Sequence, residues 1–250
     1  MKMLITFFNY LENRDDIVKS PFRKLGADRR KKITQTKEDD PIFLTIDELE
    51  KVKATQVPET LQETKDAFLV HCALGCRISD YKRFKMEHIF VTDEGIPYIH
   101  YLPKKTKGSQ TNYKEIKTPL VRYAFDIIKA REFQFRVIFY EGGKSGYNKK
   151  IKQLLELAGI DRLVPIYNEK TGENEYFPLW QRASSKTARS TCVDIMAKYQ
   201  IDMYAAGLHR RGSKAVERYT NMEIRDDFAL RNIAFRQKAY KARKDLNVVE

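Results

Sequence analysis

The sequence predicts a mainly helical protein with one small antiparallel β-sheet. The first observation is a capping box, Thr45-Ile46-Asp47-Glu48, which opens a helix that runs to about Ala54. The second is a longer pattern from Pro58 to about Leu74 with apolar residues at helical spacing. The third is a change of period over residues 89–120, where short strands alternate in polarity. Helical spacing returns after this segment, so the sheet is expected to be small.

The remaining elements follow from the same kinds of pattern. Residues 3–13 place four apolar side chains on one face of a helix. The basic residues 104–110 are expected to form the tip of a hairpin between two strands. Further helices are expected at residues 120–133, 147–158, 185–199, 202–208 and 213–219, and from residue 223 to the low 240s.

The charge of the chain points to a polyanionic partner. Its 250 residues include 47 Lys and Arg against 34 Asp and Glu, a net charge of +13. Nucleic acid is the first candidate partner and an anionic membrane surface is the second. No run approaches the roughly 18 apolar residues of a membrane-spanning helix, and the N-terminus lacks the features of a secretory signal. We therefore expect a soluble, cytoplasmic protein.

Two regions are expected along the chain. Residues 1–40 combine the first helix with a basic, irregular stretch that includes Lys32, and this stretch is either solvated or lies along a DNA backbone. A new unit begins near Pro41, and residues 41–250 form the main domain.

The three cysteines, Cys72, Cys76 and Cys192, do not form an even disulfide framework. The first two, with His71, sketch half of a zinc site, but no second pair of ligands follows at suitable spacing. We therefore expect core cysteines and no metal site.

Two segments carry cations that suit phosphate binding. In the run Gly75-Cys76-Arg77-Ile78-Ser79-Asp80, Arg77 follows a glycine that ends a helix. A new helix is expected to begin at Ser79 or Asp80, so that the Arg77 guanidinium lies beside a helix N-terminus and can hold two phosphate oxygens. In the run Ser184-Ser185-Lys186-Thr187-Ala188-Arg189, a helix that begins at the serines places Lys186 and Arg189 on one face.

A third segment contains a basic turn, His209-Arg210-Arg211, followed by a short helix and then Tyr219. Taken singly, each of the three segments is also typical of ordinary surface or packing residues. In this order and at these separations they resemble the catalytic domain of the tyrosine recombinase (phage integrase) family, which shares its fold with type IB topoisomerases.

The resemblance covers residues 41–240, and residues 1–40 are similar to the end of the core-binding domain that precedes the catalytic domain in this family. The run from Ser184 to Arg189 is similar to the one in integrases of Bacteroides-type mobile elements, as is the run that starts at Tyr147.

The resemblance implies catalytic roles for individual residues. Arg77 matches the first arginine of the family, Arg189 the second, Lys105 the hairpin lysine and Tyr219 the nucleophile. The two arginines would stabilise charge on the non-bridging phosphate oxygens. Lys105 would protonate the leaving 5′-oxygen, which leaves the DNA joined to Tyr219 through a 3′-phosphotyrosyl bond. No metal, ATP, other cofactor or small-molecule substrate is implied.

The sequence departs from the family pattern at two positions. Lys186 stands where most integrases have histidine, and lysine is familiar there among the topoisomerases. A second histidine usually lies nine residues before the tyrosine, where this chain has Arg210, while His209 lies ten residues before it. Either the loop carries one extra residue and His209 serves, which we prefer, or Arg210 has taken its place. Lys186 or His209 would assist removal of the Tyr219 proton.

Double-stranded DNA is the expected partner. Basic residues outside the catalytic set are expected to contact it, namely Lys104, Lys107, Arg83, Arg211 and Lys32. The resemblance implies a homotetramer on DNA and a bacterial, nucleoid-associated location. It also leaves open whether the C-terminal helix packs on its own domain or docks on a neighbouring subunit.

Two alternative functions remain open from the sequence. A type IB topoisomerase would use the same chemistry as a monomer, and a degenerate integrase would only bind DNA.

Overall fold

The computed structural model describes residues 2–15, 20–24, 41–104, 115–139, 144–168, 171–199, 224–242 and 248–249. Two compact units divide the chain, one formed by Met1–Asp40 with Pro165–Glu175 and the other by Pro41–Val164 with Tyr176–Glu250. Helices dominate the described residues and the main sheet is small and antiparallel, which confirms the predicted class.

The smaller unit contains the predicted N-terminal helix. This helix, α1 (Lys2–Asp15), is followed by a one-turn 3-10 helix, η1 (Pro21–Lys24). The rings of Phe8 and Phe22 meet edge to face with their centroids 5.9 Å apart, and this contact joins the two helices.

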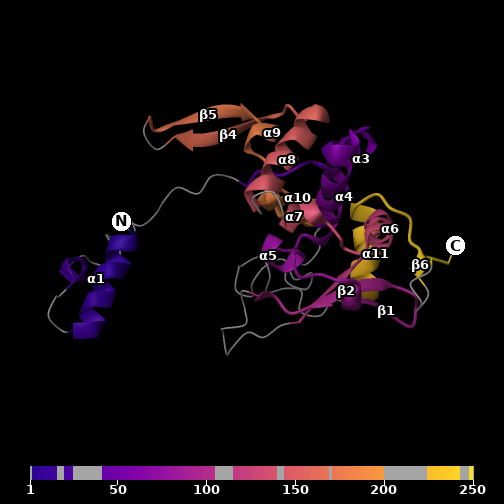
Figure 1. Ribbon diagram of the computed structural model, residues 1–250, viewed down its shortest axis with the longest axis horizontal. Helices are drawn as coiled ribbons and strands as arrows, with labels where there is room; N and C mark the ends of the chain where they lie inside the picture. Colours follow the sequence, from indigo (N-terminus) through magenta and orange to yellow (C-terminus); the bar gives the residue numbers. More distant parts are fainter. Residues whose placement is uncertain are drawn as a thin grey trace. The chain divides into compact units, whose positions relative to one another are not determined.

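The larger unit is organised around α4 (Glu59–Leu74), whose residues from Ala67 to Leu74 are all buried. A helix that is buried on every side must have neighbours on every side. Five helices pack against it (Figure 1), namely α3 (Ile46–Ala54), α6 (Arg122–Arg131), α7 (Arg136–Phe139), α8 (Lys144–Leu157) and α10 (Ser185–Lys198). Short helices at α5 (Ile78–Tyr81), η2 (Met86–His88) and α9 (Leu179–Arg182) complete this region.

The predicted capping box begins α3. The Glu48 N–H donates to the Thr45 hydroxyl at 3.2 Å, and the Thr45 N–H donates to the Glu48 carboxylate at 2.8 Å. Both bonds satisfy amides that an α-helix leaves without partners in its first turn.

The main sheet has the strand order β1 (Ile89–Val91), β2 (Pro97–Tyr101) and β3 (Ile116–Pro119), with both pairs antiparallel. Ile99 lies opposite both Ile89 and Thr118. These three side chains are buried, whereas Phe90 is exposed on the other face. The sheet therefore has one apolar face against the helices, and α11 (Ile224–Ala234) packs against β3.

The prediction of a C-terminal helix that reaches the low 240s was wrong, because α11 ends at Ala234. Arg236 has a left-handed backbone with φ +52°, and the Gln237 N–H bonds back to the Asn232 carbonyl at 2.6 Å. This geometry is a helix stop that glycine usually forms. Beyond it, β6 (Lys241–Ala242) pairs with β7 (Val248–Val249).

The structure also contains a hairpin that we did not predict, formed by β4 (Leu163–Asn168) and β5 (Glu173–Pro178). The helices predicted at 202–208 and 213–219 lie outside the described residues. Among the residues that the structure describes, no helix is long and apolar enough to span a bilayer.

The three cysteines are free and buried, which confirms that they belong to the core.

Candidate functional site

The two arginines predicted to hold the non-bridging phosphate oxygens (the clamp arginines, Arg77 and Arg189) lie near each other at the C-terminal end of α4. Arg77 occupies the N-cap position of α5, and Arg189 lies on α10. The Arg189 guanidinium donates to the Gly75 carbonyl at 2.9 Å, two residues before Arg77. Burial lowers the pKa of Arg189, and the positive charge of Arg77 lowers it further. The fold therefore brings two positive charges from distant parts of the sequence close enough to repel each other.

The helix after Arg77 differs from the prediction. We expected its N-cap at Ser79 or Asp80, but α5 begins at Ile78 with Arg77 itself at the cap. The reason is that the Arg77 carbonyl accepts the N–H groups of both Asp80 and Tyr81 at 2.9 Å. A helix of one turn has little dipole, so the guanidinium rather than the helix N-terminus supplies the positive charge here.

Lys186 and Arg189 lie on α10 as predicted. Ser184 caps this helix, and its hydroxyl accepts the Lys186 N–H at 3.2 Å. The Ser185 N–H donates to the Asn148 side chain of α8 at 2.8 Å, which ties the start of α10 to α8. Lys186 is exposed whereas Arg189, one turn later, is half-buried. Lys186 thus faces solvent, whereas Arg189 is held by its hydrogen bond to the Gly75 carbonyl.

The base of the predicted basic hairpin is anchored to α5 by Asp80. Asp80 is buried, and its carboxylate accepts the Lys104 N–H at 2.8 Å. Arg83 lies at the same junction, with Nη1 3.5 Å from the Leu102 carbonyl and 4.0 Å from Asp80. Lys104, an exposed residue, is therefore held beside the helix that Arg77 caps.

Sequence reasoning missed Asp80 as an anchor. The only signal was its position three residues after Arg77, which is also typical of an ordinary first-turn carboxylate in a helix.

The charge of Arg189 affects the pKa values of two rings, the buried His71 and the half-buried Tyr101. Burial raises the pKa of Tyr101, which Asp80 raises further and Arg189 opposes. Burial lowers the pKa of His71 to about 4, with Arg189 contributing in the same direction. Neither ring is suited to act as a nucleophile or base near neutral pH, because Tyr101 stays protonated and His71 stays neutral within the core.

The remaining predicted site residues lie outside the described residues. They are Lys105, Lys107, His209, Arg210, Arg211, Tyr219 and Lys32. Within the described ranges no group of three His, Cys, Asp or Glu side chains lies close enough to hold a metal ion.

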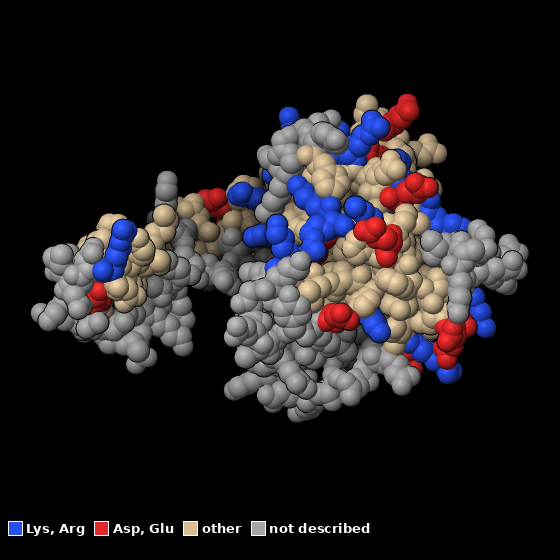
Figure 2. Space-filling model, turned by 60° about the horizontal axis from the view of Figure 1, so that its bottom comes forward, with Lys and Arg blue, Asp and Glu red and all other residues tan. Residues whose placement is uncertain are grey.

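One face of the larger unit carries a cluster of positive charge. Figure 2 shows Lys and Arg side chains gathered over the middle of one face. Such a cluster would attract phosphate groups, since exposed cations release bound counterions when they pair with a polyanion.

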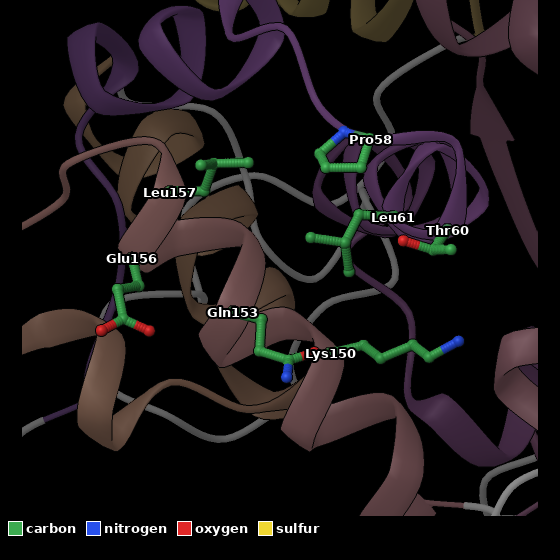
Figure 3. Close-up of a pocket in the computed structure, with 7 residues that line it drawn as sticks. All are labelled: Pro58, Thr60, Leu61, Lys150, Gln153, Glu156 and Leu157. Atoms are coloured by element: carbon green, nitrogen blue, oxygen red, sulfur yellow. The ribbon is translucent and has the colours of Figure 1, made fainter.

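An open groove of about 490 Å³ lies between the start of α4 and α8 (Figure 3). Pro58, Leu61 and Leu157 give it an apolar floor, and Lys150 and Glu156 border it. None of the predicted catalytic residues lines this groove.

Comparisons with known proteins add no relative, because no family model, curated protein or solved structure matches this chain.

Proposed function

We propose that this chain is the DNA-cleaving domain of a tyrosine recombinase, an enzyme that breaks and rejoins DNA strands through a 3′-phosphotyrosyl intermediate. The observation that carries the proposal is the proximity of Arg77 and Arg189 at the C-terminal end of α4. Two half-buried like charges repel each other, and a bound anion would relieve that repulsion. A DNA phosphate is the anion that the segments' resemblance and the net charge of +13 both favour.

The proposed reaction follows from these groups. The Tyr219 oxygen attacks phosphorus and forms a new O–P bond while the bond from phosphorus to the 5′-oxygen breaks. Arg77 and Arg189 hold the two non-bridging oxygens, and losing one such preorganised donor typically costs about 3–4 kcal/mol of transition-state stabilisation. Lys186 or His209 assists removal of the tyrosine proton, and Lys105 protonates the departing 5′-oxygen. Each is a proposal that rests on the matched positions in the sequence.

The first test is covalent capture on a nicked suicide duplex, from which the cleaved strand escapes before religation. We expect a protein–DNA adduct on a denaturing gel with the unaltered chain and none with Tyr219→Phe, because the variant lacks the attacking oxygen. Tyr199→Phe, a change of the same chemistry at an exposed tyrosine of the described surface, is the matched control and should form the adduct.

The result also separates the alternatives. Retarded DNA without an adduct, on a substrate that contains the natural site, would leave a protein that only binds DNA. An adduct formed by a protein that never bridges two duplexes would favour a type IB topoisomerase.

A further inference from the structure

Side chains from two other helices bind carbonyls in the last turn and at the C-cap of α4. The Arg231 guanidinium of α11 donates to the Ala73 carbonyl at 3.2 Å, and the Arg189 guanidinium of α10 donates to the Gly75 carbonyl at 2.9 Å. The Cys192 thiol also reaches the Ala73 carbonyl, at 3.7 Å. The final carbonyls of a helix have no partners within the helix and carry partial negative charge, so arginine is a suitable donor for them.

Arg231 is fully buried and is paired within its own helix. Its Nε lies 2.8 Å from the carboxylate of Asp227, which is also buried. Removing both charges from water costs about as much as their attraction returns, and apolar replacements of such pairs are often neutral or stabilising. Stability alone is therefore a weak reason for a fully buried ion pair at this place.

We infer that Arg231, held by Asp227, is a positioning residue for the proposed strand-transfer site, and this inference rests on the function proposed above. Arg231 and Arg189 bind carbonyls two residues apart, and Arg77 follows two residues later. The guanidinium is a planar group with fixed donor directions, so it can lock the carbonyl that it binds. Through Ala73, α11 fixes the chain segment that sets the distance between the two clamp arginines.

The contacts of α11 also show that it packs on its own domain. Phe228 is buried on this helix, Phe235 is buried directly after its end, and α11 packs against α10 and β3 of this chain. Among the two arrangements that the sequence left open for the C-terminal helix, the described residues show packing on its own domain. The inference gives that packing a role in the reaction.

The experiment replaces the pair without leaving a buried charge, in the double variant Asp227→Leu/Arg231→Met. Adduct formation on a pool of nicked random-sequence duplexes at saturating DNA is compared with that of the unaltered chain. We expect a thermal midpoint within a few degrees of the original, unchanged DNA affinity, and a rate at least about 10-fold lower, since small misplacements of catalytic groups are costly. Arg225→Met, an exposed arginine of the same helix, should keep the full rate.

Each possible result either supports the positioning role of Arg231 or overturns it. A double variant that folds and cleaves at the original rate would overturn it, because a purely structural pair is replaceable. If the double variant does not fold, Arg231→Lys serves in its place. It keeps the charge beside Asp227 but lacks the fork that also reaches Ala73, so we expect slower cleavage, and an unchanged rate would overturn the inference.

A chain that forms no adduct even when unaltered would count against the proposed function and leave the positioning role to a second measurement. Amide hydrogen exchange of residues 74–77 needs no reaction. We expect it to be at least about 10-fold faster in the variant, whereas unchanged protection would overturn the positioning role itself.

Discussion

His71 is a buried histidine whose neutral form the core requires. Its Nε2 lies 3.1 Å from the Cys76 carbonyl, which it reaches as a donor, and its ring stacks on those of Tyr81 and Tyr147 with centroids 4.8 and 6.3 Å away. Burial lowers its pKa to about 4 from 6.5, and Arg189 adds to the effect. Between these two pH values His71 is therefore protonated in the unfolded chain but neutral in the folded chain.

This difference predicts an acid-sensitive fold. Stability from His71 is fully present above about pH 6.5 and is lost as the pH falls towards 4, by about 3 kcal/mol over that window. In His71→Gln the amide can still donate to Cys76 but does not titrate, so this part of the pH dependence should disappear from urea-unfolding curves. His88→Gln, a substitution outside the core, is the control and should retain it. An unchanged slope in His71→Gln would mean that other groups cause the acid sensitivity.

At the residue scale the sequence predicted where charged residues lie better than it predicted which groups they contact. The positions of Arg77, Lys186 and Arg189 relative to helix boundaries followed from local runs. The contacts of Asp80 with the Lys104 N–H and of Arg231 with the Ala73 carbonyl did not, because only the tertiary fold brings these groups near each other. A buried arginine has no local signature, since arginine in a helix is ordinarily exposed.

At the scale of elements, success followed the strength of the local signal. The capping box at Thr45 and the alternation in β2 involve neighbouring residues, and both appeared as expected. The end of α11 is a left-handed arginine where glycine would have given a signal, so the helix was predicted too long. The hairpin β4–β5 was missed because β5 is mostly exposed and β4 buries only Val164, so neither strand shows a sustained alternation.

The exposure of this hairpin predicts that it can be removed. The Leu179 N–H donates to the Arg162 carbonyl at 2.8 Å, so the chain is already closed at the base of the hairpin. Replacing residues 165–176 with a short Gly-Ser turn should change the free energy of unfolding by less than about 1 kcal/mol, because none of the described residues of this segment is buried and such residues contribute little. The adduct yield should remain within about 3-fold of the original.

The control for this excision is Leu179→Ala at the same base. Leu179 is fully buried, and truncating such a side chain usually costs about 2–5 kcal/mol. Urea unfolding measures both changes. A loss of several kcal/mol on excision would show that the hairpin supports the core.

At the scale of the whole molecule, the count of 47 Lys and Arg residues overstates the number of cations that are free to meet DNA. Arg231 is fully buried with Asp227, and Arg131 and Arg162 form ion pairs with carboxylates at 2.6 and 2.9 Å. Exposed cations without such a carboxylate partner are the ones available to pair with further phosphates, and Lys186 is an exposed cation of the larger unit.

This reasoning predicts a steep dependence of duplex binding on salt. A protein that contacts about 6–10 phosphates loses roughly 10³–10⁵ in affinity between about 50 and 200 mM salt, because bound counterions are released on association. We expect Lys186→Ala to reduce the slope of log K against log salt by about 1, measured by fluorescence anisotropy. Lys53→Ala should leave the slope unchanged, since that ammonium already lies 3.4 Å from the Glu50 carboxylate. A cleaving enzyme and a protein that only binds DNA would share the steep slope, so a flat slope in the unaltered chain would contradict DNA as the partner itself, whatever reaction follows.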